Sequence, residues 1–252
     1  MDLAVFDINH VSSLAPAVSR EEASPSPCSA CKIRNLTICA PLNDAEQAQM
    51  AAIVSHVELE GGGPLFDEGE PAEHVYNVTS GTLKIYKLLP DGRRQVTGFL
   101  FAGDFLGLAN EDDYAYSAEA VTHCSLCRFP RRKLEILMQR FPKVEQRLLS
   151  IASNELAAAQ EQMLLLGRKT AREKIASFLL LLANRAHQRG VNDSPVSVPM
   201  SRTDIGDFLG LTTETVSRTF TQLKQNNLIR LMPNGLVELS AREDLEDIAG
   251  GF

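Results

Sequence analysis

Short apolar runs separated by turn residues fill the first half of the chain. The runs 74–78, 83–88 and 95–101 are divided by turn signals such as Pro90-Asp91-Gly92. Several strands of this length at roughly ten-residue spacing are typical of an all-β sandwich or barrel. The pattern therefore predicts such a domain, with one further strand over 124–129.

Beyond Pro142 the spacing of the apolar positions becomes helical. One stripe advances in alternating steps of three and four residues through Leu149, Ala152, Leu156, Ala159, Met163 and Leu166. This spacing predicts a helix over about 143–166, and a regular three-four repeat is typical of the seam between two helices. A single helix packed on its own domain is the alternative. The narrow stripe and its two alanines favour a parallel homodimer.

A second helical pattern centres on Gly210, after an apolar helix predicted over 171–186. A tight turn between two helices needs a residue that tolerates positive φ, as Gly210 does, and Gly206 lets the helices approach closely. The segment 229–239 then has the form of a strand, a turn and a strand. Together these features predict a winged helix-turn-helix.

The second helix of this motif carries side chains suited to reading DNA bases: Thr213, Glu214, Ser217 and Arg218. Arginine can donate two hydrogen bonds to guanine, glutamate can accept one from cytosine, and serine can contact a base edge. Glu214, Ser217 and Arg218 share one helix face because they lie at positions i, i+3 and i+4. The alternative is an ordinary helical hairpin on which these residues form a solvated face.

Composition narrows the class of protein. Of the 252 residues, 44% are apolar and 23% are charged, which is typical of a soluble globular protein. No apolar run approaches the ~20 residues that cross a bilayer, and the N-terminus lacks an export signal, so we expect a cytoplasmic protein with no membrane partner. The histidines show no metal-pair spacing, and no phosphate loop or nucleophile elbow appears, so we do not expect an enzyme.

Charge is unevenly distributed along the chain. The net charge of −7 by itself weighs against nucleic-acid binding. Residues 1–167 carry 14 basic and 22 acidic side chains, whereas residues 168–240 carry 10 basic and 6 acidic ones. The part that contains the helix-turn-helix is therefore positive, as attraction to phosphates requires.

The five cysteines fall into a Cys-x2-Cys-x7-Cys set at Cys28, Cys31 and Cys39 and a Cys-x2-Cys pair at Cys124 and Cys127. An odd number without an export signal favours metal or redox chemistry over a disulfide framework. Four thiolates suit either zinc or an iron–sulfur cluster. Zinc usually draws on two ligand pairs, whereas Cys39 favours three ligands from one segment and one from the strand. Uncoordinated or thiol-redox cysteines are a further alternative.

From about residue 28 to residue 248 the chain resembles the CRP/FNR superfamily of bacterial transcription factors. The resemblance is carried by four glycines, Gly69, Gly81, Gly103 and Gly107, followed by the long helix and the winged helix-turn-helix in that family's order. The FNR branch matches through the cysteine set and through Ser-Leu-Cys-Arg-Phe-Pro (125–130), Gln-Met-Leu-Leu-Leu (162–166) and Glu-Thr-Val-Ser-Arg (214–218).

The residue patterns and the resemblance together predict an α+β fold in five parts, of which the first is expected to be mobile because it has no helical or strand periodicity. These are a mobile leader at 1–27, a cluster-binding cysteine segment at 28–40, a β-roll (jelly-roll) sensory domain at 41–142, a dimerisation helix at 143–170 and a winged helix-turn-helix DNA-binding domain at 171–252. The resemblance also implies an oxygen-labile [4Fe-4S] cluster with ligands Cys28, Cys31, Cys39 and Cys127, Cys124 being the alternative fourth ligand.

FNR-like proteins regulate transcription at low oxygen, where the cluster favours a homodimer. The resemblance therefore implies that this protein binds palindromic double-stranded DNA with TTGAT half-sites and that it contacts RNA polymerase as an activator. In such a complex Arg218 would contact guanine, Glu214 the cytosine paired to a guanine, and Ser217 a thymine.

CRP-like members of the same superfamily instead bind a cyclic nucleotide through a Gly-Glu pair and an Arg-Ser pair. The corresponding positions here are Gly107-Leu108 and Tyr116-Ser117, which lack the Glu for the ribose and the Arg for the phosphate. Binding of a cyclic nucleotide is therefore an alternative for which the polar contacts to the ribose and the phosphate are missing. A regulator of the same fold with a structural zinc or a thiol-redox site is the other alternative.

Overall fold

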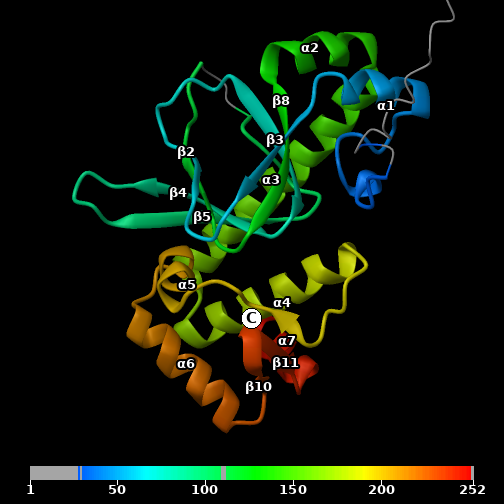
Figure 1. Ribbon diagram of the computed structural model, residues 1–252. Coiled ribbons are helices and arrows are strands. Elements are labelled where there is room, and N and C mark those ends of the chain that lie inside the picture. The colour runs from blue at the N-terminus through cyan, green and yellow to red at the C-terminus, as the bar shows by residue number, and fades with distance from the viewer. Residues whose placement is uncertain (1–27, 29, 109–111, 251–252) are drawn as a thin grey trace, which may run out of the picture.

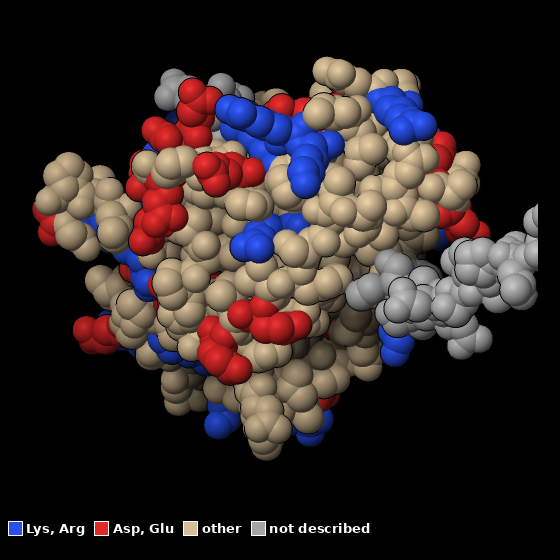
Figure 2. All heavy atoms as spheres, turned by 45° about the horizontal axis from the view of Figure 1, so that its top comes forward, with Lys and Arg blue, Asp and Glu red and all other residues tan. Residues whose placement is uncertain are grey.

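The computed structural model describes residues 28, 30–108 and 112–250 and shows a β-rich domain and a C-terminal domain joined by one long helix (Figure 1). The leader predicted at 1–27 lies outside these residues. Lys and Arg side chains are mixed with Asp and Glu on the face shown in Figure 2. Among the described helices, none is both long and apolar enough to cross a membrane.

Two four-stranded antiparallel sheets form the β-rich domain. The first has the order β1 (Ser55–Leu59), β8 (Cys124–Pro130), β3 (His74–Ser80) and β6 (Phe105–Leu106). The second has the order β2 (Pro64–Phe66), β7 (Ser117–Ala120), β4 (Thr82–Leu88) and β5 (Arg94–Phe101). Their inner faces share a core in which Val78, Leu83 and Leu126 have no exposed surface. The predicted β-sandwich is confirmed.

The outer face of the first sheet is covered by the cysteine segment and by helices. The covering elements are the short 3₁₀ helix η1 (Arg34–Leu36), α1 (Asp44–Ala51) and α2 (Arg131–Arg140). Ile38 of the cysteine segment and Met50 of α1 are buried there together with Phe129 of β8. This second core fixes the cysteine segment against the sheet.

The long helix α3 (Pro142–Arg168) agrees with the helix predicted over 143–166. Its 27 residues extend about 40 Å at 1.5 Å per residue. Val144 is buried in the core beside the cysteine segment, whereas Leu165 is buried in the core of the C-terminal domain. One helix therefore connects the two domains.

The C-terminal domain contains α4 (Ala171–Gln188), β9 (Val196–Ser197), α5 (Arg202–Leu209), α6 (Thr213–Gln225), β10 (Ile229–Leu231), η2 (Pro233–Gly235), β11 (Leu236–Leu239) and α7 (Arg242–Gly250). Its three strands pair in the order β10, β11, β9. Gly210 has a φ of 63° between α5 and α6, and a Cβ on Gly206 would lie 2.6 Å from the backbone oxygen of Leu211. The predicted winged helix-turn-helix is confirmed, with both glycines in the roles that the sequence indicates.

Helix α5 packs against β4 and β5 through charged groups that are largely buried. The Nζ of Lys84 lies 2.9 Å from a carboxylate oxygen of Asp204, and the guanidinium of Arg94 lies 2.7 Å from the same oxygen. Glu119 pairs with Lys84 at 2.8 Å, and Asp207 pairs with Arg94 at 2.9 Å. We call these five residues the interdomain ion-pair cluster. Beside it lies an aromatic group made of Phe99, Phe178 and Phe208.

Candidate metal centre and nucleic-acid interface

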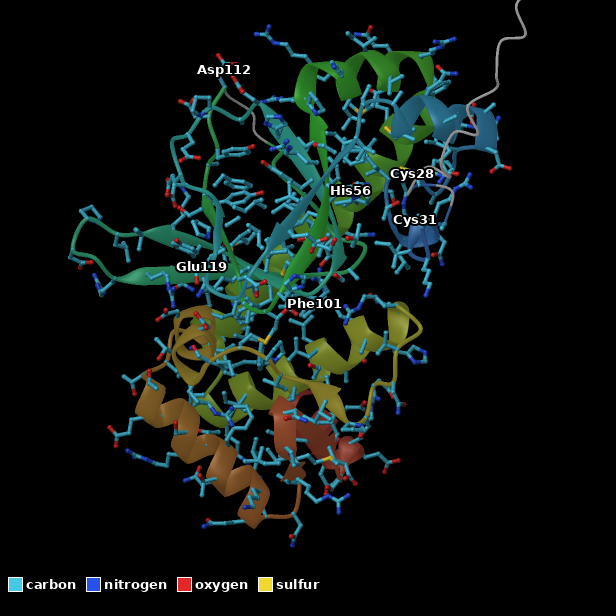
Figure 3. All side chains as sticks on the ribbon, in the orientation of Figure 1. Cys28, Cys31, His56, Phe101, Asp112 and Glu119 are labelled. Carbon is cyan, nitrogen blue, oxygen red and sulfur yellow. The ribbon has the colours of Figure 1, made fainter. Side chains whose placement is uncertain are left out.

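Four of the five cysteines line one pocket on the outer face of the first sheet. The pocket has a volume of about 260 Å³, and its cysteines are Cys28, Cys31, Cys39 and Cys127. The first three come from the segment that precedes α1, and Cys127 comes from β8. Figure 3 shows Cys28 and Cys31 on this segment, beside the sheet. The structure therefore brings together residues that lie about ninety to a hundred positions apart in the sequence.

Cys124 lies on the opposite face of the same strand. Side chains alternate along a strand, so residues three positions apart point to different faces. Cys124 is completely buried inside the sandwich, where its Sγ lies 3.2 Å from the backbone oxygens of Thr82 and Thr122. Cys124 therefore lies apart from the other four cysteines, which line the pocket together.

The cysteine segment is held by hydrogen bonds as well as by the buried side chain of Ile38. The guanidinium of Arg34 donates to the backbone oxygen of Leu42, and it lies 3.2 Å from the carboxylate of Asp44. The amide of Gln47 on α1 donates to the backbone oxygen of Cys28. These contacts tie the cysteine segment to α1 and to the residues that lead into it.

Burial raises the pKa of the Cys127 thiol to about 12 and that of the Cys39 thiol to about 11. The neighbouring thiols add to both effects, whereas a hydrogen bond with Thr37 and, to a smaller extent, the charge of Arg34 lower the pKa of Cys39. Binding of a metal by these cysteines must therefore release protons. Within the described parts of the chain, no three His, Cys, Asp or Glu side chains are placed to hold one metal ion.

The face of α6 that the sequence assigned to DNA is open to solvent. Thr213, Glu214, Ser217 and Arg218 are all exposed, whereas Val216 and Phe220 on the other face are buried. Arg218 and Glu214 pair with each other at 2.5 Å, with side chains that are 64% and 80% exposed. The hydroxyl of Ser217 donates to the backbone oxygen of Thr213 at 2.9 Å. An exposed pair of this kind is weak, so both charges are available for other partners.

Most of the predicted dimer seam is exposed on α3. Leu149, Leu156 and Met163 are 68%, 62% and 63% exposed, and Ala152 and Ala159 are also exposed. Leu166 differs from the prediction because it is half-buried against the core of the C-terminal domain. Leu164, which lies off the predicted stripe, is 62% exposed. Exposed apolar side chains at this density indicate an interaction surface.

The interior of the sandwich is filled by aromatic side chains near the positions that would bind a cyclic nucleotide. The rings of Phe66 and Tyr114 stack with their centroids 3.7 Å apart, and Tyr76 lies beside Phe66. The hydroxyl of Tyr116 accepts a hydrogen bond from the backbone amide of Gly107 at 3.2 Å. Tyr116 therefore binds the protein's own turn, at the position where the CRP-like pattern has an arginine for the phosphate.

Sequence reasoning missed two polar residues beside Cys127. His56 of β1 and Asn77 of β3 line the same pocket. The one available signal was the position of Asn77, a single amide within the apolar run 74–78. His56 carried no signal, because the pairing of β1 with β8 joins segments about seventy residues apart.

Comparison with known proteins places the chain among regulators. Residues 56–141 match the cyclic nucleotide-binding domain, and residues 173–248 match the Crp-like helix-turn-helix domain. The transcriptional activatory protein AadR of Rhodopseudomonas palustris is 44% identical over 207 residues, which cover 82% of this chain and 86% of AadR. The transcriptional activator protein FnrL of Cereibacter sphaeroides is 39% identical, with 81% of this chain and 84% of FnrL covered.

Solved structures agree with this placement. The structure of FixK2 from Bradyrhizobium japonicum matches with a TM-score of 0.73 at 37% identity, covering 78% of this chain and 97% of FixK2. The family consists of transcription regulators rather than enzymes, and its helix-turn-helix members bind DNA and dimerise. This chain belongs to the CRP/FNR family of DNA-binding transcription regulators.

Proposed function

We propose that this protein is an oxygen-responsive transcription activator with a [4Fe-4S] cluster held by Cys28, Cys31, Cys39 and Cys127. In this proposal the cluster favours a homodimer that binds palindromic DNA with TTGAT half-sites and acts with RNA polymerase. The observation that carries the proposal is the single pocket lined by these four cysteines.

The donor set suits a cluster better than a single ion. Four cysteine thiolates are the ordinary ligands of a [4Fe-4S] cluster, which when bound would supply an oxygen-reactive centre. Lys32 and Arg34 also line the pocket and can offset negative charge. Structural zinc sites usually draw on two ligand pairs. Here three of the candidates come from one segment, and Cys124, the second member of the other pair, is buried inside the sandwich and does not line the pocket.

The chain itself connects the pocket to α3. A guanidinium nitrogen of Arg147 donates to the backbone oxygen of Leu36 at 3.1 Å. One turn earlier, the Nζ of Lys143 pairs with the carboxylate of Glu46 on α1. The first contact holds α3 to the segment that carries three of the cysteines, and the second holds α3 to the helix that follows this segment. Release of this segment from β8 would therefore disturb the helix that bears the proposed dimer seam.

The metal content of protein purified without oxygen tests the first half of the proposal. We expect a brown solution with roughly four iron atoms per chain, whose visible absorption is lost in air. Cys127→Ala should abolish iron binding, and Cys124→Ala, a cysteine on the inner face of the same strand, should retain it. Colourless protein with one zinc per chain would refute the proposal.

Binding to a palindromic TTGAT site tests the second half. Arg218→Ala should weaken specific binding by about 1–3 kcal/mol while leaving the dimer intact. The loss should be smaller on a site in which the guanine of each half-site is changed, because the contact to that base is already absent. Undiminished affinity for the unchanged site would contradict the role of Arg218.

A further inference from the structure

Cys127 lies in the middle of a row of polar side chains on the outer face of the first sheet. His56 of β1 and Asn77 of β3 are the residues directly opposite Cys127 in the strand register. Directly opposed residues of antiparallel strands carry their side chains on the same face of the sheet. All three line the pocket that the other ligand candidates also line. Figure 3 labels His56 in this region, beside Cys31.

Asn77 is the buried member of this row. It is 1% exposed, and its Oδ1 has no hydrogen-bond partner among the described residues. Its neighbours in the outer core, Val75 on the same strand and Phe129 opposite Val75, are apolar. Burial of an unpaired amide atom costs free energy, and such atoms are rare in folded proteins. Packing alone would favour leucine at this position, so the amide calls for another explanation.

The amide complements a sulfur ligand. Its two ends are an NH₂ donor and an oxygen acceptor of similar shape, and a half-turn about the terminal C–C bond exchanges them. A metal-bound thiolate accepts hydrogen bonds and donates none. The NH₂ end of Asn77 is therefore the group that a liganded Cys127 would face. His56 is exposed, and its Nδ1 lies 4.0 Å from the Cys127 Sγ, at the opposite side of the same sulfur.

We propose that Asn77 is a positioning residue of the metal centre, whose amide donates a hydrogen bond to the Cys127 sulfur and slows the loss of the centre in air. This inference rests on the proposed function. Hydrogen bonds to the sulfurs of iron–sulfur centres, together with burial, tune the reduction potential of the metal. A donor to the loaded centre explains why this buried position carries an amide and not the leucine that packing alone would favour.

The substitution Asn77→Leu keeps the number and branching of the side-chain heavy atoms and removes the donor, and it should change two measurements in opposite directions. The metal-free protein should unfold at a higher urea concentration, because the unpaired amide is gone. The iron-loaded protein should lose its visible absorption in air about tenfold faster, which corresponds to ~1.4 kcal/mol and lies near the range for a hydrogen bond to a charged group.

Two further variants separate this role from a merely structural one. Thr79→Val changes a residue on the same strand face and in the same pocket, and should alter neither measurement. Asn77→Ser keeps a donor and should recover part of the air stability. Equal rates of bleaching in wild type and Asn77→Leu would overturn the inference. Wild-type protein that binds no iron would overturn the proposed function instead. In that case the metal-free proteins still test the inference: if Asn77→Leu unfolds at a lower urea concentration than wild type, the unpaired amide does not destabilise the fold.

Discussion

Removal of the charge on Asp204 is expected to loosen the DNA-binding domain from the β-sandwich. Its carboxylate accepts hydrogen bonds from Lys84 at 2.9 Å and from Arg94 at 2.7 Å, which lie 120 and 110 residues away in the sequence. It also accepts one from the hydroxyl of Ser201 at 2.6 Å, at the start of α5. Asp204→Asn keeps the shape of the side chain and removes the charge that both cations face.

The magnitude follows from the burial of the interdomain ion-pair cluster. The side chains of Lys84 and Asp204 are 7% and 9% exposed. Breaking a buried ion pair costs about 3–5 kcal/mol, because the remaining charge is left without its partner. Here Lys84 keeps Glu119 at 2.8 Å and Arg94 keeps Asp207 at 2.9 Å. We therefore expect the lower end of that range, a loss of about 3 kcal/mol in the free energy of unfolding.

The same carboxylate gives the effect a pH dependence. Burial acts to raise the pKa of Asp204, but the hydrogen bonds from Ser201 and Lys84 and the two positive charges outweigh it and lower the pKa. A lowered native pKa means that the stabilisation is complete above the unfolded-state value of about 3.9 and is lost as the pH falls through the native value. The difference between wild type and Asp204→Asn should be full at pH 7 and smaller at pH 3.

Urea unfolding at the two pH values measures this difference. Asp247→Asn, an exposed carboxylate on α7, is the matched control and should change the free energy of unfolding by less than about 0.5 kcal/mol. Limited proteolysis of the folded protein should also cut Asp204→Asn faster in the segment between the two domains. A loss below about 1 kcal/mol at pH 7, or the same loss at both pH values, would refute the reasoning.

Other substitutions test the remaining parts of the structure. Leu156→Glu places a charge in the proposed seam and should convert the dimer to a monomer in gel filtration; an unchanged dimer would place the interface elsewhere. Gly206→Ala brings a Cβ within 2.6 Å of a backbone oxygen and should lower the free energy of unfolding by about 1–3 kcal/mol, measured by urea unfolding. Arg147→Met removes the hydrogen bond to Leu36 and should speed proteolysis of the cysteine segment, and equal cleavage rates would contradict that role.

The local spacing of apolar residues was sufficient to predict the helices and strands whose own residues follow a regular pattern. The short apolar runs divided by turn residues predicted the sandwich, and the three-four repeat predicted α3 to within two residues at each end. Gly206 and Gly210 identified the helix-turn-helix because each meets a requirement of the local backbone, a close approach in one case and a positive φ in the other. Such features depend on neighbours in the sequence, which the sequence displays directly.

The choice between Cys124 and Cys127 shows where local pattern becomes ambiguous. Alternation alone says that the two face opposite sides of the strand. Cys124 shares its face with Leu126, and Cys127 shares its face with Phe129, so both faces are apolar. Only the packing of the cysteine segment against one of them distinguishes the faces. In a strand covered on both sides, the alternation of side chains therefore does not identify the functional face, and the preference for Cys127 came from the family resemblance.

Contacts between segments that are distant in the sequence could not be predicted either, because local patterns do not show which segments pack together. Asn77 belongs to the site because the strand register places it opposite Cys127, and Asp204 contributes to the interdomain contact because it pairs with Lys84. Charge counting found a positive C-terminal region but could not show that two of its acidic residues face cations of the β-sandwich. The contribution of such charged groups to the free energy of unfolding depends on their burial, which only the folded chain determines.

In the proposed function, α3 connects a change at the cysteines to DNA binding. The helix proposed to contact DNA, α6, keeps its position relative to the β-sandwich of the same chain. Arg147 and Leu149 lie two residues apart, which is about 200° around a helix with 3.6 residues per turn. One side of α3 therefore contacts the cysteine segment through Leu36, and the other side exposes the apolar stripe. Because the interdomain ion-pair cluster fastens α5 to the sandwich, the proposed function requires that a change at the cysteines act through α3 on assembly of the proposed dimer. The spacing of two recognition helices, and with it the affinity for a palindrome, depends on that assembly.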